Sequence, residues 1–216
     1  MKNTVLATLA LIASAALISP GAYAGGDPKN GEGLSAVCAA CHGADGNSAT
    51  PMFPKIAGLG ENYLHKQLGD IKSGARVVPE MNGILDSMSE QDLQDLAAYF
   101  NSKQTQLSGA KDETLALNSG ESISALKLGE KVYRAGNAST GVPACTGCHS
   151  PRGLGNGPAA YPRLSGQYAA YIEKQLLSFR KGERKNDGEA RVMRGVAEHM
   201  SEAEIKAVAA YIAGLH

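Results

Sequence analysis

The stretch Cys38-Ala39-Ala40-Cys41-His42 determines how the rest of the chain can be interpreted. Two cysteines three positions apart, followed directly by a histidine, are typical of a c-type haem attachment site. The thiols add to the vinyl groups of the porphyrin, and the histidine binds the iron. The pattern returns as Cys145-Thr146-Gly147-Cys148-His149, which uses up the cysteines of the chain. We therefore predict two covalently bound haem c groups, attached through Cys38, Cys41, Cys145 and Cys148, with His42 and His149 as proximal iron ligands.

Two other kinds of site share this cysteine spacing. A C-x-x-C pair can be a redox-active dithiol near a βαβ unit, or it can supply half of a zinc site. A zinc site made from the four cysteines would leave His42 and His149 without a role. The repeated histidine therefore favours haem over zinc.

The first residues have the features of a secretory signal peptide. Lys2 precedes an apolar run from Val5 to Ile18, and Ala22-Tyr23-Ala24 supplies a small-x-small cleavage site. The apolar run is shorter than the roughly 20 residues that a membrane-spanning helix needs. We predict that residues 1–24 are removed by cleavage after Ala24 and that the mature protein is exported and soluble.

The haem motif belongs to a longer unit that occurs twice. Phe53-Pro54-Lys55 after the first motif corresponds to Tyr161-Pro162-Arg163 after the second. Other corresponding pairs are Gly31-Glu32 with Gly129-Glu130, Tyr63–Leu68 with Tyr171–Leu176, and Gly74–Arg76 with Gly182–Arg184. We predict two homologous domains, residues 25–112 and 113–216, joined by an irregular linker at about 105–122.

Each unit has the apolar spacing of helices and no convincing strand alternation, so we expect an all-α fold. The helices are predicted at about 30–40, 61–73 and from 89 onward, then at 124–134, 167–181 and 201–213. Ser89 with Asp92, and Ser201 with Glu204, are spaced as capping boxes at helix starts. The loop after each haem motif could offer a backbone carbonyl to the proximal histidine, and Pro54 and Pro162 occupy matching positions there.

Composition and charge add two expectations. The chain has no tryptophan and only 5% aromatic residues, so each small domain needs the porphyrin as part of its core. Residues 25–112 contain 7 basic and 11 acidic residues (net −4), whereas 113–216 contain 13 and 10 (net +3). Opposite charges would let a donor and an acceptor bind at different ends, with Lys181, Arg184 and Lys185 available at the basic one. No basic run is interleaved with aromatics, so nucleic acid is not expected as a partner.

An electron carrier has a sixth ligand on its haem iron, whereas a catalyst or gas binder leaves the sixth coordination position open. Met52 has no counterpart in the repeat. Met88 and Met200 precede the capping serines, where an apolar residue commonly packs on the helix. Met81 and Met193 are paired in the repeat and lie in segments without helical periodicity. Spacing thus favours Met81 and Met193 and leaves Met88 and Met200 as the alternative.

The mature chain resembles the bacterial two-haem cytochrome c-four family over nearly its whole length. The matching stretches are 39–48, Phe53-Pro54-Lys55, Pro143–Ser150, Asn186-Asp187-Gly188 and Tyr211–His216. The resemblance implies two tandem class I cytochrome c domains related by an approximate two-fold axis. It also implies His/Met ligation of both irons, through Met81 and Met193. One departure is that the segment 76–80 is shorter than its counterpart 184–191, which affects the reach of Met81.

The resemblance further implies a monomeric periplasmic electron carrier rather than an enzyme. Its partners would be a redox donor and an acceptor such as a membrane terminal oxidase, with peripheral membrane association as an option. An alternative is a dihaem peroxidase or small-molecule dehydrogenase, which would need a distal acid or base. His65 and His199 are the spare histidines, but neither recurs in the repeat. A haem-based gas sensor is disfavoured because no output domain follows.

Overall fold

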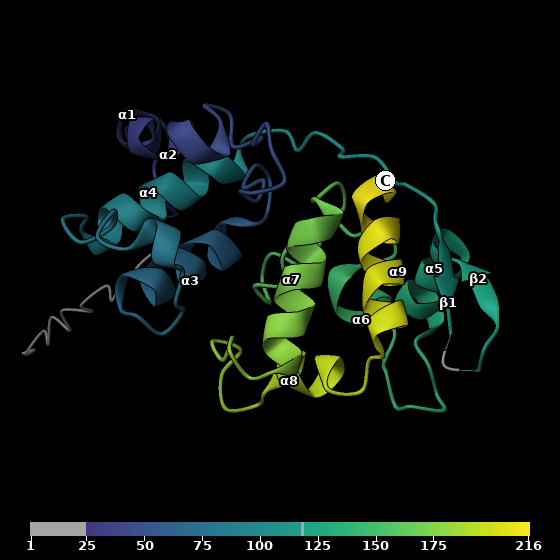
Figure 1. Cartoon of the computed structure of the whole chain (residues 1–216). Coiled ribbons are helices and arrows are strands. Elements are labelled where there is room, and N and C mark those ends of the chain that lie inside the picture. The colour runs from purple at the N-terminus through teal and green to yellow at the C-terminus, as the bar shows by residue number, and fades with distance from the viewer. Residues whose placement is uncertain (1–24, 118) are drawn as a thin grey trace, which may run out of the picture.

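The computed structural model describes residues 25–117 and 119–216, so the predicted signal peptide lies outside the described residues. The chain forms two helical halves joined by one extended connection (Figure 1). The first half contains α1 (Pro28–Leu34), α2 (Ala36–His42), α3 (Glu61–Lys72), the 3₁₀ helix η1 (Pro79–Met81) and α4 (Glu90–Asn101). The second contains β1 (Thr114–Ala116), β2 (Ser122–Ser124), α5 (Ala125–Ala135), α6 (Thr146–His149), α7 (Ala169–Arg180), α8 (Val192–Ala197) and α9 (Glu202–Gly214).

The predicted helices agree with the structure except at the first one. The expected helix over 30–40 is two helices, α1 and α2, which meet at Ser35. The Ser35 hydroxyl donates to the carbonyl oxygen of Glu32 at 2.9 Å, a local bond that competes with the helical ladder. Both capping boxes are confirmed, at Ser89 before α4 and at Ser201 before α9.

The prediction of a helical fold holds, but it missed one small sheet. β1 and β2 form an antiparallel hairpin with Leu115 opposite Ile123, inside the segment predicted as an irregular linker. Leu115 packs with Ala125 and Ala207 in a small apolar cluster beside α5 and α9. Strands of three residues are too short for alternation to be visible in the sequence.

A glycine lets the first helix of each half, α1 or α5, cross the last one closely. A Cβ atom on Gly31 of α1 would lie 2.0 Å from the carbonyl oxygen of Asp95 in α4. A Cβ atom on Gly129 of α5 would lie 2.1 Å from the carbonyl oxygen of Ala207 in α9. The repeated Gly-Glu pairs therefore mark backbone-to-backbone helix crossings.

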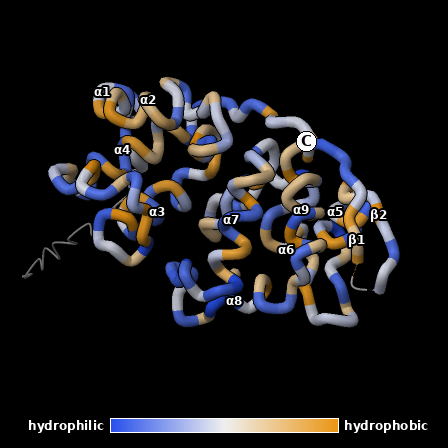
Figure 2. The backbone as a smooth tube through the Cα atoms, in the orientation of Figure 1, coloured by the Kyte–Doolittle hydropathy of each residue, from blue (hydrophilic) through white to orange (hydrophobic). Residues whose placement is uncertain are grey.

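Each half has an apolar core to which its helices contribute, and apolar residues recur along those helices in the hydropathy colouring (Figure 2). In the first half α4 buries Leu96, Ala97 and Phe100 beneath α3. In the second half Ile205, Val208 and Ile212 of α9 form the core with α5 and α7. In the portions of the chain that the structure describes, no helix combines the length and apolar character needed to cross a bilayer.

Helices α3 and α7, which correspond in the repeat, face each other where the two halves meet (Figure 1). Arg76 after α3 donates to Gln67 of its own half at 2.8 Å. The same guanidinium donates across the interface to the Tyr171 hydroxyl at 2.9 Å and to Gln175 at 3.2 Å. Arg76 thus joins the two halves through their matching helices.

Arg184, the counterpart of Arg76, makes the reciprocal set of bonds. It donates to Gln175 of its own half at 2.6 Å. Across the interface it donates to Gln67 at 2.9 Å and to the Tyr63 hydroxyl at 3.4 Å. Corresponding residues therefore exchange partners, as an approximate two-fold axis requires.

Candidate haem-binding sites

The first site is built around His42, the last residue of α2. Its ring is buried, and Nδ1 lies 2.8 Å from the carbonyl oxygen of Pro54. A carbonyl can only accept, so Nδ1 carries the proton and Nε2 carries the lone pair. The sequence expectation of a backbone carbonyl beside the histidine is confirmed. The imidazole is thus held in the tautomer that a metal ligand needs.

The second site repeats this arrangement at His149, the last residue of α6. Nδ1 of His149 lies 3.0 Å from the carbonyl oxygen of Pro162. Burial lowers the pKa of both His42 and His149, against an opposing effect of these hydrogen bonds. Both imidazoles are therefore held neutral with an available lone pair.

An aromatic ring lies beside each of these two imidazoles, a feature that was not predicted from the sequence. Phe53 lies edge-on to His42 with ring centroids 6.2 Å apart, and Tyr161 lies tilted to His149 at 6.0 Å. Each aromatic residue directly precedes the proline whose carbonyl accepts from the histidine. The signal was present in the repeated aromatic-proline pairs, and the ring adds a second constraint on the imidazole orientation.

Cys38 and Cys41 lie in α2 with His42, whereas in the second motif Cys148 lies in α6 with His149 and Cys145 is the N-cap of that helix. Burial, with a smaller effect of Cys41, raises the pKa of Cys38 to about 11. Burial also raises the pKa of Cys145 to about 11. Across residues 25–117 and 119–216, no three His, Cys, Asp or Glu side chains are grouped to hold a metal ion. The alternative of a zinc site made from four cysteines has no support in this arrangement.

A large, mainly apolar cavity adjoins the first motif. It contains about 990 Å³ of space outside protein atoms, part of it open to solvent. Cys38, Cys41 and His42 line it, and so does Met81. Its other apolar lining comes from α3, α4 and neighbouring loops and includes Ile56, Leu64, Leu68, Leu85, Leu96 and Phe100. A flat apolar group attached to the cysteines fits this space.

The candidate methionines fall into three environments. Met81 ends η1 and reaches the cavity despite the short preceding segment, and Met193 lies in α8 against the second core. Both segments are short helices, so the expectation of irregular structure there is wrong. Met200 is fully packed in the second core and Met88 packs on the first, as expected for residues before a capping serine. Met52 is 79% exposed.

The second half closes part of the first cavity. Arg76 and Tyr63 line it from the first half, and Tyr171 lines it from α7. Burial opposes ionisation of Tyr63, but Arg184 and Arg76 outweigh this effect and hold the pKa of its phenol below the ordinary value. Arg184 is therefore an interface residue, which corrects its interpretation as a free surface charge for docking.

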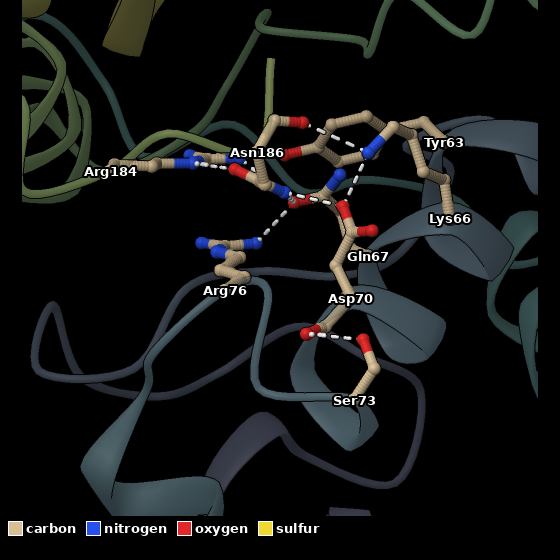
Figure 3. Close-up of polar contacts among 8 residues, drawn as sticks. All are labelled: Tyr63, Lys66, Gln67, Asp70, Ser73, Arg76, Arg184 and Asn186. Atoms are coloured by element: carbon tan, nitrogen blue, oxygen red, sulfur yellow. Dashed lines mark hydrogen bonds and ion pairs between the residues drawn. The ribbon is translucent and has the colours of Figure 1, made fainter. Parts of the chain in front are cut away.

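The longer loop of the second half extends this network (Figure 3). Asn186 donates through Nδ2 to Gln67 at 2.9 Å and to Asp70 at 2.7 Å. Lys66 in turn donates to the Asn186 carbonyl oxygen at 2.9 Å. The segment 184–191, which is longer than its counterpart 76–80, therefore uses its additional residues to contact the first half.

The spare histidines lie apart from this cavity. His65 of α3 pairs with Glu90 at 2.7 Å, and His199 lies 3.6 Å from Glu198. Neither is among the residues that line the cavity. His65 therefore does not face the first candidate site, where the enzyme alternative would need an acid or a base.

A family model described as cytochrome c matches residues 28–104 and 126–216, one match for each half. Cytochrome c4 from Azotobacter vinelandii is 51% identical over 99% of this chain and 100% of its own length. This chain belongs to the cytochrome c4 family. The crystal structure of reduced recombinant cytochrome c4 from Pseudomonas stutzeri superposes with a TM-score of 0.81 at 50% identity, covering 88% of this chain and 100% of that one.

A more distant relative of this cytochrome c4 family member is the thiosulfate dehydrogenase electron acceptor of Stutzerimonas stutzeri strain A1501. It is 37% identical over 83% of this chain and 79% of its own length. Membership of the cytochrome c4 family confirms two tandem cytochrome c domains, with the small hairpin as an addition to the predicted all-α fold. The protein is a dihaem electron-transfer protein with two covalently bound haem c groups.

Proposed function

We propose that the chain is a periplasmic electron carrier with His42 and Met81 on one iron and His149 and Met193 on the other. The observation that supports this most directly is that His42, Met81 and both cysteines of the first motif line one cavity. The cationic Arg76 at the same cavity suits the propionate groups of a haem. In this assignment Cys38, Cys41, Cys145 and Cys148 carry the thioether bonds.

The bound haem supplies one-electron exchange at its iron. The protein holds the ligands and excludes water. Pro54 and Pro162 fix the proximal imidazoles, and the methionine sulfur, a soft ligand, favours the reduced state. Apolar lining lowers the local dielectric and raises the potential further. A filled sixth position also prevents substrates from reaching the iron, so this is a carrier and no enzyme.

Residues 25–112 and 113–216 are taken as the two domains, and the cleaved leader 1–24 as the export signal. The polar interface between α3 and α7 places the domains in contact, so an electron can enter one haem and leave from the other. The monomer would exchange electrons with a donor and with a membrane terminal oxidase, and it can associate peripherally with the membrane. A second candidate role, acceptor for a thiosulfate dehydrogenase, is supported by the name of the more distant relative.

Replacing each methionine in turn tests the ligand assignment. Met81→Ala and Met193→Ala should each remove half of the long-wavelength methionine-to-iron absorption and lower one of the two potentials. Met88→Leu and Met200→Leu are matched controls, because both side chains pack in the cores and should leave the spectrum unchanged. Loss of the band in a control, with an unchanged spectrum in Met81→Ala or Met193→Ala, would reassign the ligand.

A further inference from the structure

The peptide unit between Pro54 and Lys55 has a hydrogen-bond partner at each end. Its carbonyl oxygen accepts from His42 Nδ1 at 2.8 Å. Its amide N–H, on Lys55, donates to the side-chain oxygen Oε1 of Gln167 at 3.0 Å. Resonance couples the two ends of one planar peptide group. A single amide therefore connects the proximal imidazole of the first domain to a side chain of the second.

The carboxamide of Gln167 is held firmly in this position. Its Nε2 donates to the Lys55 carbonyl oxygen at 2.7 Å, so it pairs with both polar groups of the Lys55 backbone. The Tyr168 N–H also donates to Oε1, at 3.0 Å. Gln167 is 3% exposed and Lys55 is 4% exposed. Hydrogen bonds in such a dry environment polarise one another more strongly than they do in water.

We propose that Gln167 of the second domain is a positioning residue that lowers the reduction potential of the haem in the first domain. Accepting from Lys55 N–H shifts electron density toward the Pro54 oxygen. That oxygen then accepts more strongly from His42 Nδ1, which makes Nε2 a more electron-rich ligand. A more basic ligand stabilises the oxidised iron. The inference rests on the proposed function, in which His42 is the proximal ligand.

The corresponding peptide of the second domain shows how Gln167 differs. Arg163 N–H donates across the interface to the backbone oxygen of Leu59 at 3.2 Å. The Pro162 carbonyl accepts from His149 at 3.0 Å. Each of these two bonds is longer than its counterpart in the first domain, and the acceptor is a backbone group. Of these two peptides, only the one between Pro54 and Lys55 donates its N–H to a side chain of the opposite domain.

A purely structural role is the competing explanation, since Gln167 also holds the two domains together. Tyr168→Phe separates the two roles. The Tyr168 hydroxyl donates to the Ser48 carbonyl oxygen at 2.5 Å, so this variant loses an interdomain bond at the adjacent residue. It leaves the Lys55 peptide and its partners in place. A general loosening of the interface would affect both variants, whereas the peptide connection is broken only in Gln167→Met.

The experiment is a spectroelectrochemical titration of the holoprotein that resolves the two haems. In Gln167→Met the equilibrium constant for reducing the first haem should rise about threefold, an upward shift of roughly 28 mV at 59 mV per tenfold change. The second haem and both potentials of Tyr168→Phe should stay unchanged.

Proton NMR of the reduced holoprotein gives a readout independent of the potential. Haem-shifted ring resonances of His42 in the wild type report the ligation itself, and their absence would overturn the proposed function. The Nδ1–H resonance of His42 should move toward that of a weaker hydrogen bond in Gln167→Met but not in Tyr168→Phe. The role of Gln167 would be overturned if His42 is ligated but its Nδ1–H resonance and the potential of the first haem are the same in wild type and in Gln167→Met. Equal shifts in Gln167→Met and Tyr168→Phe would do the same.

Discussion

Gly31→Ala should destabilise the protein, because α1 crosses α4 at this glycine with no room for a side chain. The new Cβ atom would lie 2.0 Å from the Asp95 carbonyl oxygen and 2.8 Å from the Tyr99 Cβ atom. Ordinary contact begins at 3.4 Å, so the helices would have to separate by about 1.4 Å, the difference between 3.4 and 2.0 Å. Both neighbours are rigid, and neither can rotate away as the end of a flexible side chain could.

Two opposing terms set the size of the effect. Overpacking of a rigid contact costs about 1–3 kcal/mol, and here the clash is with backbone, which favours the upper value. Alanine is the better helix former by about 1 kcal/mol. The net loss for Gly31→Ala is therefore about 2 kcal/mol, which for a chain of this size lowers the melting temperature by roughly 4–8 °C.

Gly33→Ala supplies the matched control on the same helix. A Cβ atom on Gly33 would meet nothing within 4 Å, so only the gain in helix propensity remains. This variant should be more stable than wild type by up to about 1 kcal/mol. The assay is guanidinium unfolding of the holoprotein followed by circular dichroism. If the midpoints of the two variants move in the same direction, the close crossing does not require glycine and the reasoning is wrong.

Two further changes test local features of the haem sites and the second core. Gly43→Ala should lower the free energy of unfolding by about 1–3 kcal/mol, measured by chemical denaturation, because Gly43 has a φ of +78° and a Cβ would lie 2.7 Å from the Asn47 oxygen. Burial opposes ionisation of Glu204, yet hydrogen bonds from Asn137 and Ser201 hold its pKa below the ordinary value. Its stabilisation is thus present above the ordinary carboxyl pKa and is lost as the pH falls, so Glu204→Gln should flatten the acid side of the stability profile.

Much of the site followed from covalent chemistry that is visible in the sequence. The spacing Cys-x-x-Cys-His indicates which groups can be attached and ligated, so His42 and His149 can be predicted as iron ligands without knowledge of the fold. The hydrogen bond from His42 to the Pro54 carbonyl could be predicted because a matching proline, Pro162, follows the second motif. Repeats of this kind expose positions under the same physical requirement.

Other features depend on contacts between segments far apart in the sequence. The interdomain hydrogen bonds of Arg76 and Arg184 could not be predicted, because the repeat shows where each arginine lies within its own unit but not which residues of the other unit it contacts. The pairing of β1 with β2 could not be predicted because each strand is three residues long. The break at Ser35 is accompanied by a side-chain hydrogen bond to Glu32, which is a local feature that apolar periodicity does not reveal.

The reciprocal exchange of partners by Arg76 and Arg184 has a thermodynamic consequence. It is the pattern of an isologous dimer, in which one surface recognises a copy of itself. Here both copies lie on one chain, so their association is unimolecular and the effective concentration is in the millimolar range. A set of polar bonds too weak to hold two free proteins together at cellular concentrations is then sufficient to keep the halves joined.

The connecting segment also limits how far the halves can separate when these bonds open. Ser108 bonds to the Gly166 carbonyl oxygen through both its N–H and its hydroxyl, at 3.1 and 2.8 Å. Gly109 donates to the Ala213 carbonyl oxygen at 3.0 Å. The part of the linker that is free to move is therefore shorter than the whole segment between α4 of the first half and β1 of the second. A short tether favours rapid reclosure, so the distance between the two redox centres is restored after each opening without any new encounter.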